Sequence, residues 1–294
     1  MTISPEDYRF LSDFLKKHSG LQLGDGKEYL IIGRLPPVAA SSGFASLEAM
    51  VQALRNNPPQ ALLKSVCDAM TTGETLFFRD GAPFDAFRDR LLPEAAARAR
   101  AAGRALRIWC AASSTGQEVY SVMILLKEAE AKLQGLRVEV VATDYSTPTL
   151  ARAKEAIYNQ FEVQRGLPAM MLVKYFQPVP QGFQVKPELR QGIAFSEQNL
   201  LRPFTSHGLF DIVFLRNVLI YFDVADKADV LNRMARQLHP GGVILLGGTE
   251  NTIGITDQLG RVEGFTAPVF GRTSDPMVTI RGRKSPPLAA APAR

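Results

Sequence analysis

The sequence lacks the features of a metal site, a secreted protein or a membrane protein. Its 294 residues include only two cysteines, Cys67 and Cys110, and neither has a second cysteine or a histidine at the spacing of metal ligands. We expect both to be buried, reduced thiols. No apolar run approaches the roughly 18 residues of a membrane span, and the N-terminus lacks the basic-then-apolar pattern of a signal peptide. These absences predict a cytoplasmic globular protein with no metal and no membrane insertion.

Most of the chain also lacks an excess of charge of one sign. The net charge is +5, but residues 272–294 hold five basic residues and one acidic residue and so carry +4 of it. The remainder, residues 1–271, is nearly neutral, which argues against a nucleic-acid partner. Residues 274–294 are rich in proline, alanine and basic side chains, with too little apolar surface to offset the entropy of ordering them. They are predicted to form a disordered tail.

Helical periodicity dominates the first 75 residues. Ser4 and Pro5, followed by two acidic residues, have the pattern of a helix N-terminus. Apolar residues then recur at helical spacing in three further segments, residues 29–38, 47–54 and 62–70. We therefore predict an all-helical domain over residues 1–75.

Short apolar segments alternate with helical stretches from about residue 104 onward. This alternation predicts an α/β domain with a parallel sheet, which we place over residues 76–273. Residues 183–185 and 193–195 are predicted to pair as an antiparallel hairpin outside that sheet, within a small β subdomain of about residues 177–197. The predicted strands of the main sheet are residues 106–111, 138–143, 212–215 and 243–246, and the predicted helices between them are residues 117–133 and 225–238.

Two features lie at predicted strand ends, where open parallel sheets bind their ligands. Residues 112–118 form a loop of small side chains that leads into a helix, and Asp144 ends the second strand, where nucleotide-binding sheets accept hydrogen bonds from ribose. The loop lacks the repeated glycines of a dinucleotide site and the lysine of a phosphate loop, so it favours a nucleoside without phosphate. Each feature also has a plain alternative: tight helix–strand packing for the loop, and a helix cap for Asp144.

Residues 71–80 carry a specific resemblance. Their sequence, Thr-Thr-Gly-Glu-Thr-Leu-Phe-Phe-Arg-Asp, resembles the Thr-Thr-Asn-Glu-Thr-x-Phe-Phe-Arg signature of chemotaxis receptor glutamate methyltransferases, the CheR family. The resemblance extends over residues 5–273. It implies a Rossmann-like methyltransferase sheet with a helical N-terminal domain and a small antiparallel β insertion. The further segments that agree in order and spacing are residues 109–121, 142–144, 199–200, 211–223 and 247–250.

The resemblance implies S-adenosylmethionine as cofactor, with S-adenosylhomocysteine as product. Thr75 and Arg79 would reach its methionine end, with the guanidinium addressing the carboxylate, and Glu118 would meet the ammonium group. Gly73 also belongs to this set, but it replaces the family's asparagine and so removes one side-chain hydrogen bond. Taken alone, Arg79 could be a surface ion pair and Glu118 an ordinary acid at a helix start.

The same resemblance assigns the nucleoside end of the cofactor. Asp144 would accept hydrogen bonds from the ribose hydroxyls, and Asn199 and Leu200 would contact the adenine. Arg216 and Asn217 would line the cleft.

The implied substrate is a glutamate carboxylate on the cytoplasmic signalling helices of methyl-accepting chemotaxis receptors. Such a carboxylate, with a reference pKa of about 4.3, is already ionised at neutral pH, so no catalytic histidine is required. Arg79 and Tyr221 are the candidates for orienting it, although Tyr221 could also be a core aromatic residue.

Departures from the family pattern limit what the resemblance implies about affinity and docking. Gln117 and Val119 replace a glutamate and a proline of the first loop, so cofactor affinity is open. The helix of about residues 27–40, richly basic in some relatives, has only Lys27 and Arg34 here. The hairpin around residues 178–182 is shorter than in relatives that grip a receptor's C-terminal peptide. We expect a monomer that works without such a tether.

Other functions stay open on the sequence alone. A methyltransferase for a small molecule or nucleic acid would share the loop and Asp144, but it would not need residues 71–80. A nicotinamide-dependent oxidoreductase conflicts with the glycine pattern. A non-catalytic sensor that binds the cofactor and regulates a partner is the alternative from a different class.

Overall fold

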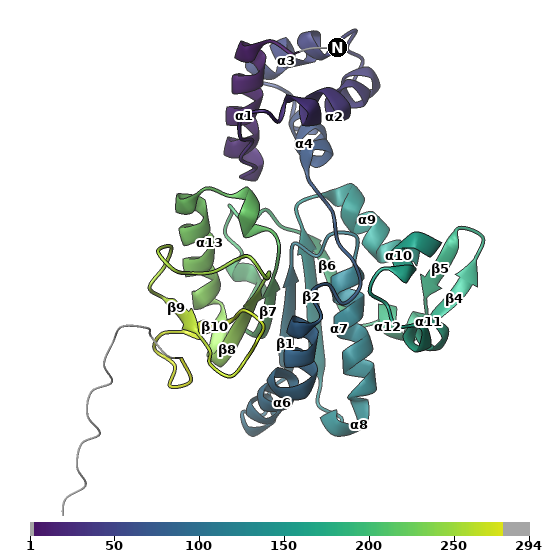
Figure 1. Cartoon of the computed structure of the whole chain (residues 1–294), viewed down its shortest axis with the longest axis vertical. Helices are drawn as coiled ribbons and strands as arrows, with labels where there is room; N and C mark the ends of the chain where they lie inside the picture. The colour runs from purple at the N-terminus through teal and green to yellow at the C-terminus, as the bar shows by residue number, and fades with distance from the viewer. Residues whose placement is uncertain (1–2, 279–294) are drawn as a thin grey trace, which may run out of the picture.

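Four helices form the N-terminal part of this computed structural model, which describes residues 3–278 (Figure 1). The first begins as predicted, because the Ser4 hydroxyl accepts a hydrogen bond of 3.1 Å from the Asp7 amide, and it ends at Gly20 with φ of 77°. Their apolar stripes meet in a separate core in which Leu11, Ile31 and Leu35 are fully buried. The helices are α1 (Pro5–Ser19), α2 (Glu28–Ser41), α3 (Leu47–Arg55) and α4 (Gln60–Met70).

A seven-stranded sheet forms the centre of the larger domain. Its order is β6-β2-β1-β7-β8-β10-β9, with the first five strands parallel and the last two antiparallel to their neighbours. The sheet confirms the predicted α/β class, and each of the four predicted strands lies within it. The strands are β1 (Leu106–Ala111), β2 (Val138–Asp144), β6 (Ile193–Glu197), β7 (Phe210–Leu215), β8 (Leu238–Leu246), β9 (Leu259–Arg261) and β10 (Val269–Arg272).

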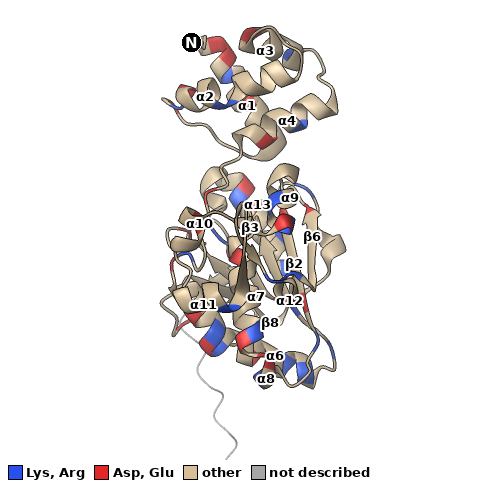
Figure 2. Ribbon diagram, turned by 90° about the vertical axis from the view of Figure 1, so that its right-hand side faces the viewer, with Lys and Arg blue, Asp and Glu red and all other residues tan. Residues whose placement is uncertain are grey.

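Helices cover both faces of this sheet, because successive strand residues point to opposite sides. In β1, Ile108 packs in the core shared with α6 and α7, whereas Trp109 packs in the core shared with α13. Basic and acidic side chains are interspersed over both domains (Figure 2). The helical segments around the sheet are α5 (Ala82–Ala86), η1 (Phe87–Leu91), α6 (Leu92–Ala101), α7 (Gln117–Glu128), α8 (Glu130–Leu133), α9 (Thr147–Glu155), η2 (Thr205–His207), η3 (Leu219–Tyr221) and α13 (Val224–Arg236).

A small antiparallel sheet lies beside the main one, in the order β3-β5-β4 (Figure 1). Its presence was predicted, but the predicted pairing of residues 183–185 with 193–195 is wrong. Residues 193–197 form β6 and extend the main sheet, because they pair in parallel with β2. The small sheet and its helices are β3 (Ile157–Tyr158), α10 (Gln160–Gln164), α11 (Ala169–Tyr175), β4 (Phe176–Val179), β5 (Gly182–Val185) and α12 (Pro187–Arg190).

The ordered chain continues past residue 273, where the disordered tail was predicted to begin. The Asp275 carboxylate accepts a hydrogen bond of 3.2 Å from the Gly241 amide, and Val278 forms a β-bridge with Val262. The prediction is therefore wrong for residues 274–278. Its remaining part, residues 279–294, lies outside the described residues.

Candidate functional site

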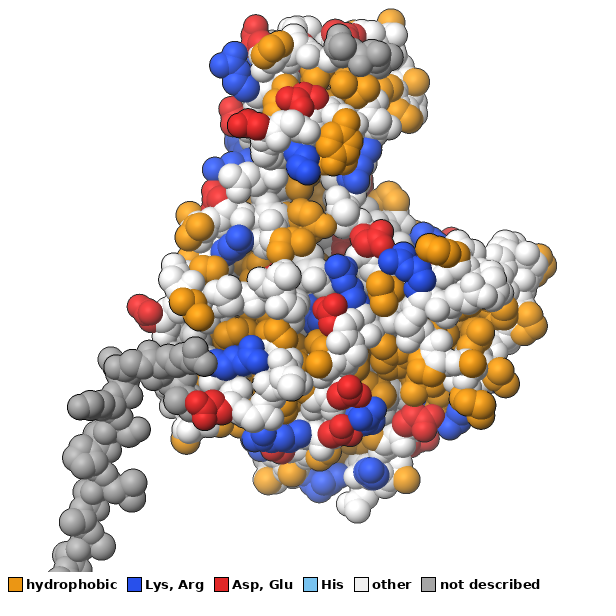
Figure 3. All heavy atoms as spheres, viewed as in Figure 1, with side chains coloured by type: hydrophobic (Ala, Val, Ile, Leu, Met, Phe, Trp, Pro, Cys, Tyr) orange, Lys and Arg blue, Asp and Glu red, His pale blue; other side chains and the backbone are white. Residues whose placement is uncertain are grey.

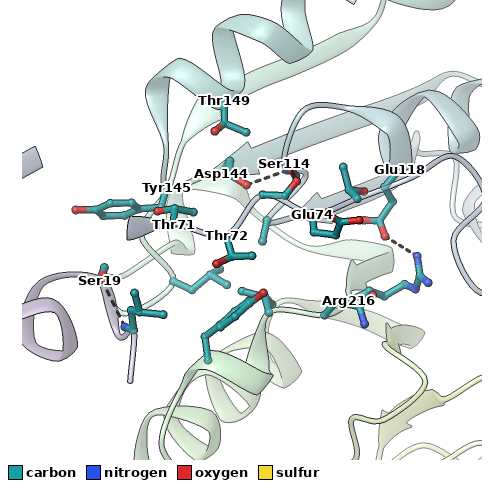
Figure 4. A pocket seen from close by; sticks show the side chains of 18 of the residues that line it. Ser19, Thr71, Thr72, Glu74, Ser114, Glu118, Asp144, Tyr145, Thr149 and Arg216 are labelled. Atoms are coloured by element: carbon teal, nitrogen blue, oxygen red, sulfur yellow. Dashed lines mark hydrogen bonds and ion pairs between the residues drawn. The ribbon is translucent and has the colours of Figure 1, made fainter. Parts of the chain in front are cut away.

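A cleft opens between the helical domain and the carboxyl ends of the parallel strands. It lies at the narrow waist below the helical domain in the space-filling view (Figure 3). Tyr145 and Ser19 lie at one end, Glu118 and Arg216 at the other, and Asp144 lies between them (Figure 4). The ten predicted site residues all line this cleft: Gly73, Thr75, Arg79, Glu118, Asp144, Asn199, Leu200, Arg216, Asn217 and Tyr221.

The segment after α4 enters the cleft because its aromatic residues anchor it. Phe77 is fully buried, and its ring meets those of Tyr158 and Phe176 edge-on with centroids 5.0 and 5.5 Å away. The Phe78 amide donates to the Ser121 hydroxyl at 3.0 Å. This anchoring leaves the polar residues of the signature free to face the cleft. Arg79 lies there, with its guanidinium donating to the Glu74 carbonyl at 2.9 Å.

The loop between β1 and α7 follows an unusual backbone path. Ala112, Ser114 and Gly116 all have positive φ, of 61°, 52° and 98°. A Cβ added at Gly116 would come within 2.8 Å of the Tyr158 hydroxyl, so the close approach requires glycine. The Ser114 hydroxyl donates to the Gly73 carbonyl at 2.8 Å and so links this loop to the signature segment.

Asp144 ends β2 with its carboxylate buried in the cleft. One oxygen accepts from the Ser114 amide at 2.8 Å, and the other accepts from the Ser146 amide at 2.9 Å. Burial raises the pKa of Asp144 above its ordinary value, and these two hydrogen bonds oppose the rise. Each oxygen keeps a lone pair for a further donor, so the carboxylate is held in place yet can still accept from a ligand.

Glu118 lies in the first turn of α7 and belongs to a buried ion network. The Arg216 guanidinium donates to its Oε2 at 2.8 Å, and also to Asp80 at 2.8 Å and to the Arg79 carbonyl at 2.6 Å. Burial raises the pKa of Glu118, and Arg216 opposes the rise. Arg216 thus fixes the Glu118 carboxylate through Oε2, and Oε1 can still accept from a cationic ligand.

Two of the remaining predicted residues, Asn199 and Tyr221, are bonded to residues at or just after the end of α1. The Asn199 side chain donates to the His18 carbonyl at 2.9 Å and accepts from the Leu201 amide at 2.9 Å. The Tyr221 carbonyl accepts from the Gln22 amide at 2.9 Å. These two hydrogen bonds fix the orientation of the Asn199 side chain in the cleft.

Lys64, on α4, ties the helical domain to the strand ends. Its ammonium group donates to the Tyr145 carbonyl, lies 3.8 Å from the centroid of the Tyr145 ring, and pairs with Asp68 at 3.0 Å and Glu197 at 2.9 Å. Tyr145 directly follows Asp144. The helical domain therefore supports the strand end that presents the Asp144 carboxylate.

Several residues of the cleft were missed from the sequence. Ser19 and Leu21 follow α1 and are remote in sequence from every strand end, so no spacing pattern connects them to the site. Tyr145 could have been found, because it directly follows the strand-end aspartate. The others that line the cleft without having been predicted include Thr71, Thr149, Gln198, Val218 and Phe222.

The side chains of the cleft fit S-adenosylmethionine. The buried Glu118 carboxylate suits an ammonium group, the Arg79 guanidinium suits a carboxylate, and Asp144 can accept from two hydroxyls. The two buried carboxylates would also stabilise a ligand with a positively charged sulfonium. Within residues 3–278, no group of three metal-ligating side chains is present. No helix in that range has the length and apolar character to cross a membrane.

The fold and this cleft define the class of S-adenosylmethionine-dependent methyltransferases. Residues 73–266 match the family described as "CheR methyltransferase, SAM binding domain", and residues 6–71 match "CheR methyltransferase, all-alpha domain". The chain belongs to the CheR methyltransferase family. It acts in chemotaxis as an S-adenosylmethionine-dependent methyltransferase, and the sensor alternative is not favoured.

Relatives match over nearly their whole length. A chemotaxis protein methyltransferase of Vibrio parahaemolyticus is 40% identical over 261 residues, covering 88% of this chain and 94% of that protein. Chemotaxis protein methyltransferase 1 of Pseudomonas aeruginosa is 39% identical over 267 residues, covering 90% and 96%. Among solved structures, the glycopeptide N-methyltransferase MtfA complexed with S-adenosyl-L-methionine is 18% identical, covers 51% of this chain and 48% of that chain, and has a TM-score of 0.31, too weak a likeness to support an argument.

Proposed function

We propose that this methyltransferase esterifies glutamate side chains on the cytoplasmic signalling helices of chemotaxis receptors. The observation that supports the proposal is a cleft that presents the carboxylates of Glu118 and Asp144 to a cationic cofactor and has no histidine among its lining residues. A hydroxyl or protonated amine acceptor would have to lose a proton to a base. A glutamate carboxylate has already lost it at neutral pH.

The methionine end of the cofactor would lie beside the first loop and the signature segment. Glu118 would bind its ammonium group through Oε1, because Oε2 is occupied by Arg216. Arg79 would bind its carboxylate. Thr75 and Gly73 line the same part of the cleft, and Ser114 fixes the Gly73 carbonyl at 2.8 Å.

The nucleoside end would lie toward the helical domain. Asp144 would accept from the ribose hydroxyls, since its two amide donors hold the carboxylate and leave lone pairs unused. Asn199 and Leu200 would contact the adenine. Arg216 would act through its ion pairs and Asn217 would line the cleft directly.

The reaction needs alignment more than acid–base chemistry. When bound, S-adenosylmethionine would supply a methyl group on a sulfonium. The carboxylate oxygen would take this methyl group, the electron pair of the carbon–sulfur bond would stay on sulfur, and no proton would move. Tyr221 and Arg79 would orient the incoming carboxylate, and such positioning can lower a barrier by roughly 7 to 11 kcal/mol.

Transfer of label from S-adenosylmethionine to a purified receptor cytoplasmic fragment tests the proposal. We expect base-labile label in the fragment, because methyl esters hydrolyse in base, and its loss when the target glutamates are changed to alanine. Stable label, label on RNA, or no label would contradict glutamate as the acceptor.

Tyr221→Phe tests the assigned role of the tyrosine hydroxyl. Among residues 3–278 this hydroxyl has no hydrogen-bond partner, so its removal leaves no protein group unsatisfied. We expect kcat to fall by about tenfold or more with the Kd for S-adenosylhomocysteine changed by less than about threefold. Turnover of receptor at the wild-type rate would show that Tyr221 has no such role.

Other parts of the proposal concern assembly. We propose that the protein is cytoplasmic and monomeric, that it binds receptors without a C-terminal peptide tether, and that it binds neither nucleic acid nor membrane. We also propose that the chain divides into a helical domain of residues 1–75, a methyltransferase domain of residues 76–273 with a β subdomain at about residues 177–197, and a C-terminal tail. The Arg34 guanidinium on α2 donates to the Met70 carbonyl at 2.9 Å, and we propose that α2 contributes little to receptor binding. Calorimetric binding of a receptor C-terminal peptide would contradict tether independence.

A further inference from the structure

Glu250, in the loop after β8, is a buried carboxylate bound by main-chain amides of two loops. Glu250 is only 7% exposed. Oε2 accepts from the Gly247 amide at 2.7 Å and the Asn217 amide at 2.8 Å, and Oε1 accepts from the Ile220 amide at 3.3 Å. No basic side chain of the described chain forms a salt bridge with it. Because burying a carboxylate is costly, three donors directed at one group indicate a specific role for it.

These hydrogen bonds fix loops rather than the sheet itself. Strands β7 and β8 already pair in parallel register from Ile212 with Val243 to Leu215 with Leu246. The Glu250 contacts begin beyond that register, in the loop of residues 216–221 that leads into the cleft.

The loop after β7 is closely packed against the loop after β8. Asn217 has φ of 56°, in the left-handed region that asparagine adopts more readily than most non-glycine residues. A Cβ added at Gly247 would come within 2.7 Å of Asn217 Nδ2 and 2.8 Å of Glu250 Oε2. Glu250 and Gly247 together therefore hold Asn217 in this conformation. Tyr221 lies four residues further along the same loop.

We propose that Glu250 is a positioning residue, which fixes the loop after β7 and thereby places Tyr221 for methyl transfer. This inference rests on the proposed function, since Tyr221 is taken to orient the glutamate acceptor. Glu250 itself is not among the residues that line the cleft. It acts through the main chain of residues 217 and 220, to which it is bonded.

Glu250→Gln tests the role at constant side-chain size. The substitution turns one acceptor oxygen into an NH2 group, which cannot accept from the amides that face it. We expect kcat for receptor methylation to fall about 10- to 100-fold, because small misplacements of an aligning group have effects of this order. The Kd for S-adenosylhomocysteine, measured by calorimetry, should rise by less than about fivefold. Glu263→Gln is the matched control, because it removes the same charge from an exposed side chain, and it should leave both quantities unchanged.

The double variant Glu250→Gln/Tyr221→Phe shows whether Glu250 acts by positioning Tyr221 or by a general effect on the stability of the site. If Glu250 acts through Tyr221, Glu250→Gln should cost less than about threefold in kcat once the tyrosine hydroxyl is absent. Full multiplication of the two single effects would overturn the inference. Wild-type kcat in Glu250→Gln would overturn it as well.

Gly247→Ala keeps the inference testable if Glu250→Gln does not fold. Its added methyl group would press on Asn217 and Glu250 and displace the same loop. We expect a lower melting temperature in a protein that still folds, and the same selective loss of kcat. An unaltered kcat in a folded Gly247→Ala protein would contradict the inference. Failure of the wild-type protein to methylate receptor glutamates would instead overturn the proposed function, and this inference with it.

Discussion

The two walls of the cleft, one from the sheet domain and one from the helical domain, differ in the charge of their side chains. The sheet side presents the charged side chains of Arg79, Glu118 and Asp144. Asp144 ends β2 and Glu118 lies in the first turn of α7, after β1, whereas Arg79 lies in the segment between α4 and α5. The side of the helical domain contributes Ser19 and Leu21, which carry no charge. The contacts from that side include hydrogen bonds to main-chain atoms of residues 145 and 221, and ion pairs of Lys16 with Asp223 and of Lys64 with Glu197.

This difference indicates that the sheet wall recognises the ligand and that the helical domain encloses it. Buried charges on the sheet side are held by fixed partners, so they can select a ligand by its charges at little reorganisation cost. The helical domain closes the cleft and supports the loops, and it does so with contacts that any ligand of suitable shape would tolerate. We therefore expect variants of the sheet wall to change cofactor affinity more than variants of the helical wall.

Glu118→Gln should have the largest effect on affinity. The change removes the charge that faces the cofactor ammonium group and weakens the ion pair with Arg216, which is 2.8 Å away. Because hydrogen bonds to charged groups contribute roughly 1.5–3 kcal/mol, we expect the Kd for S-adenosylmethionine to rise about 10- to 100-fold in calorimetry. Glu74→Gln is the control. Glu74 also lines the cleft but is exposed, and an equal loss of affinity there would remove the special status of Glu118.

Affinity should also depend on pH with a definite sign. Burial raises the pKa of both Glu118 and Asp144, so in the empty cleft these groups take up protons at a higher pH than ordinary carboxyls. A cationic cofactor favours the ionised forms, so its affinity should be full at neutral pH. It should fall as pH drops through the raised values, by at most about tenfold per pH unit for each group. Calorimetry over a range in which the melting temperature shows the protein folded checks this. Affinity that is constant down to pH about 4, or that increases with acid, would contradict it.

Lys64→Met tests the helical wall and should have a smaller effect. It removes the ion pairs with Asp68 and Glu197 and the donor to the Tyr145 carbonyl. We expect the free energy of unfolding to fall by about 1–3 kcal/mol, since Asp68 loses its partner, and the Kd to rise by about fivefold or less. Lys132→Met, an exposed lysine without a salt bridge in the described residues, serves as control. A loss of affinity as large as that of Glu118→Gln would mean that the two walls do not differ.

Gly73→Asn restores the residue of the family pattern and should have the smallest effect. Within residues 3–278, a new Cβ would approach only the Ser114 hydroxyl, at 3.3 Å, which a small shift can accommodate. One added hydrogen bond to the cofactor would lower the Kd by about threefold. Gly73→Ala, which adds the Cβ alone, should give no gain, and a gain equal to that of asparagine would exclude the hydrogen bond as its cause.

Glu118 and Asp144 of the charged wall could be predicted from the sequence because they follow strands, whereas Arg79 was predicted only from the resemblance of residues 71–80. Asp144 ends a buried apolar segment, Glu118 begins the next helix, and parallel strands bring their carboxyl ends to one edge of the sheet. The helix start at Ser4 was likewise local. A structural feature can be predicted from the sequence pattern when the contacts that produce it join residues close in the sequence.

Contacts between distant segments could not be predicted in this way. Nothing in the sequence indicates that the Asn199 amide bonds to the His18 carbonyl, or that Arg216 bonds to Glu118 and Asp80. The edge strand β6 was misplaced because its side chains are only partly buried, so its pattern resembled that of an exposed hairpin. These features depend on which surfaces meet in the folded chain.

Calorimetric titration of S-adenosylhomocysteine into the full chain tests the central claim most directly. The account predicts one site per chain and a binding heat that is strongly reduced by Glu118→Gln but not by Glu74→Gln. Folded wild-type protein that takes up none of this ligand, or that binds it equally well without the Glu118 charge, would contradict the claim that the sheet wall selects the cofactor.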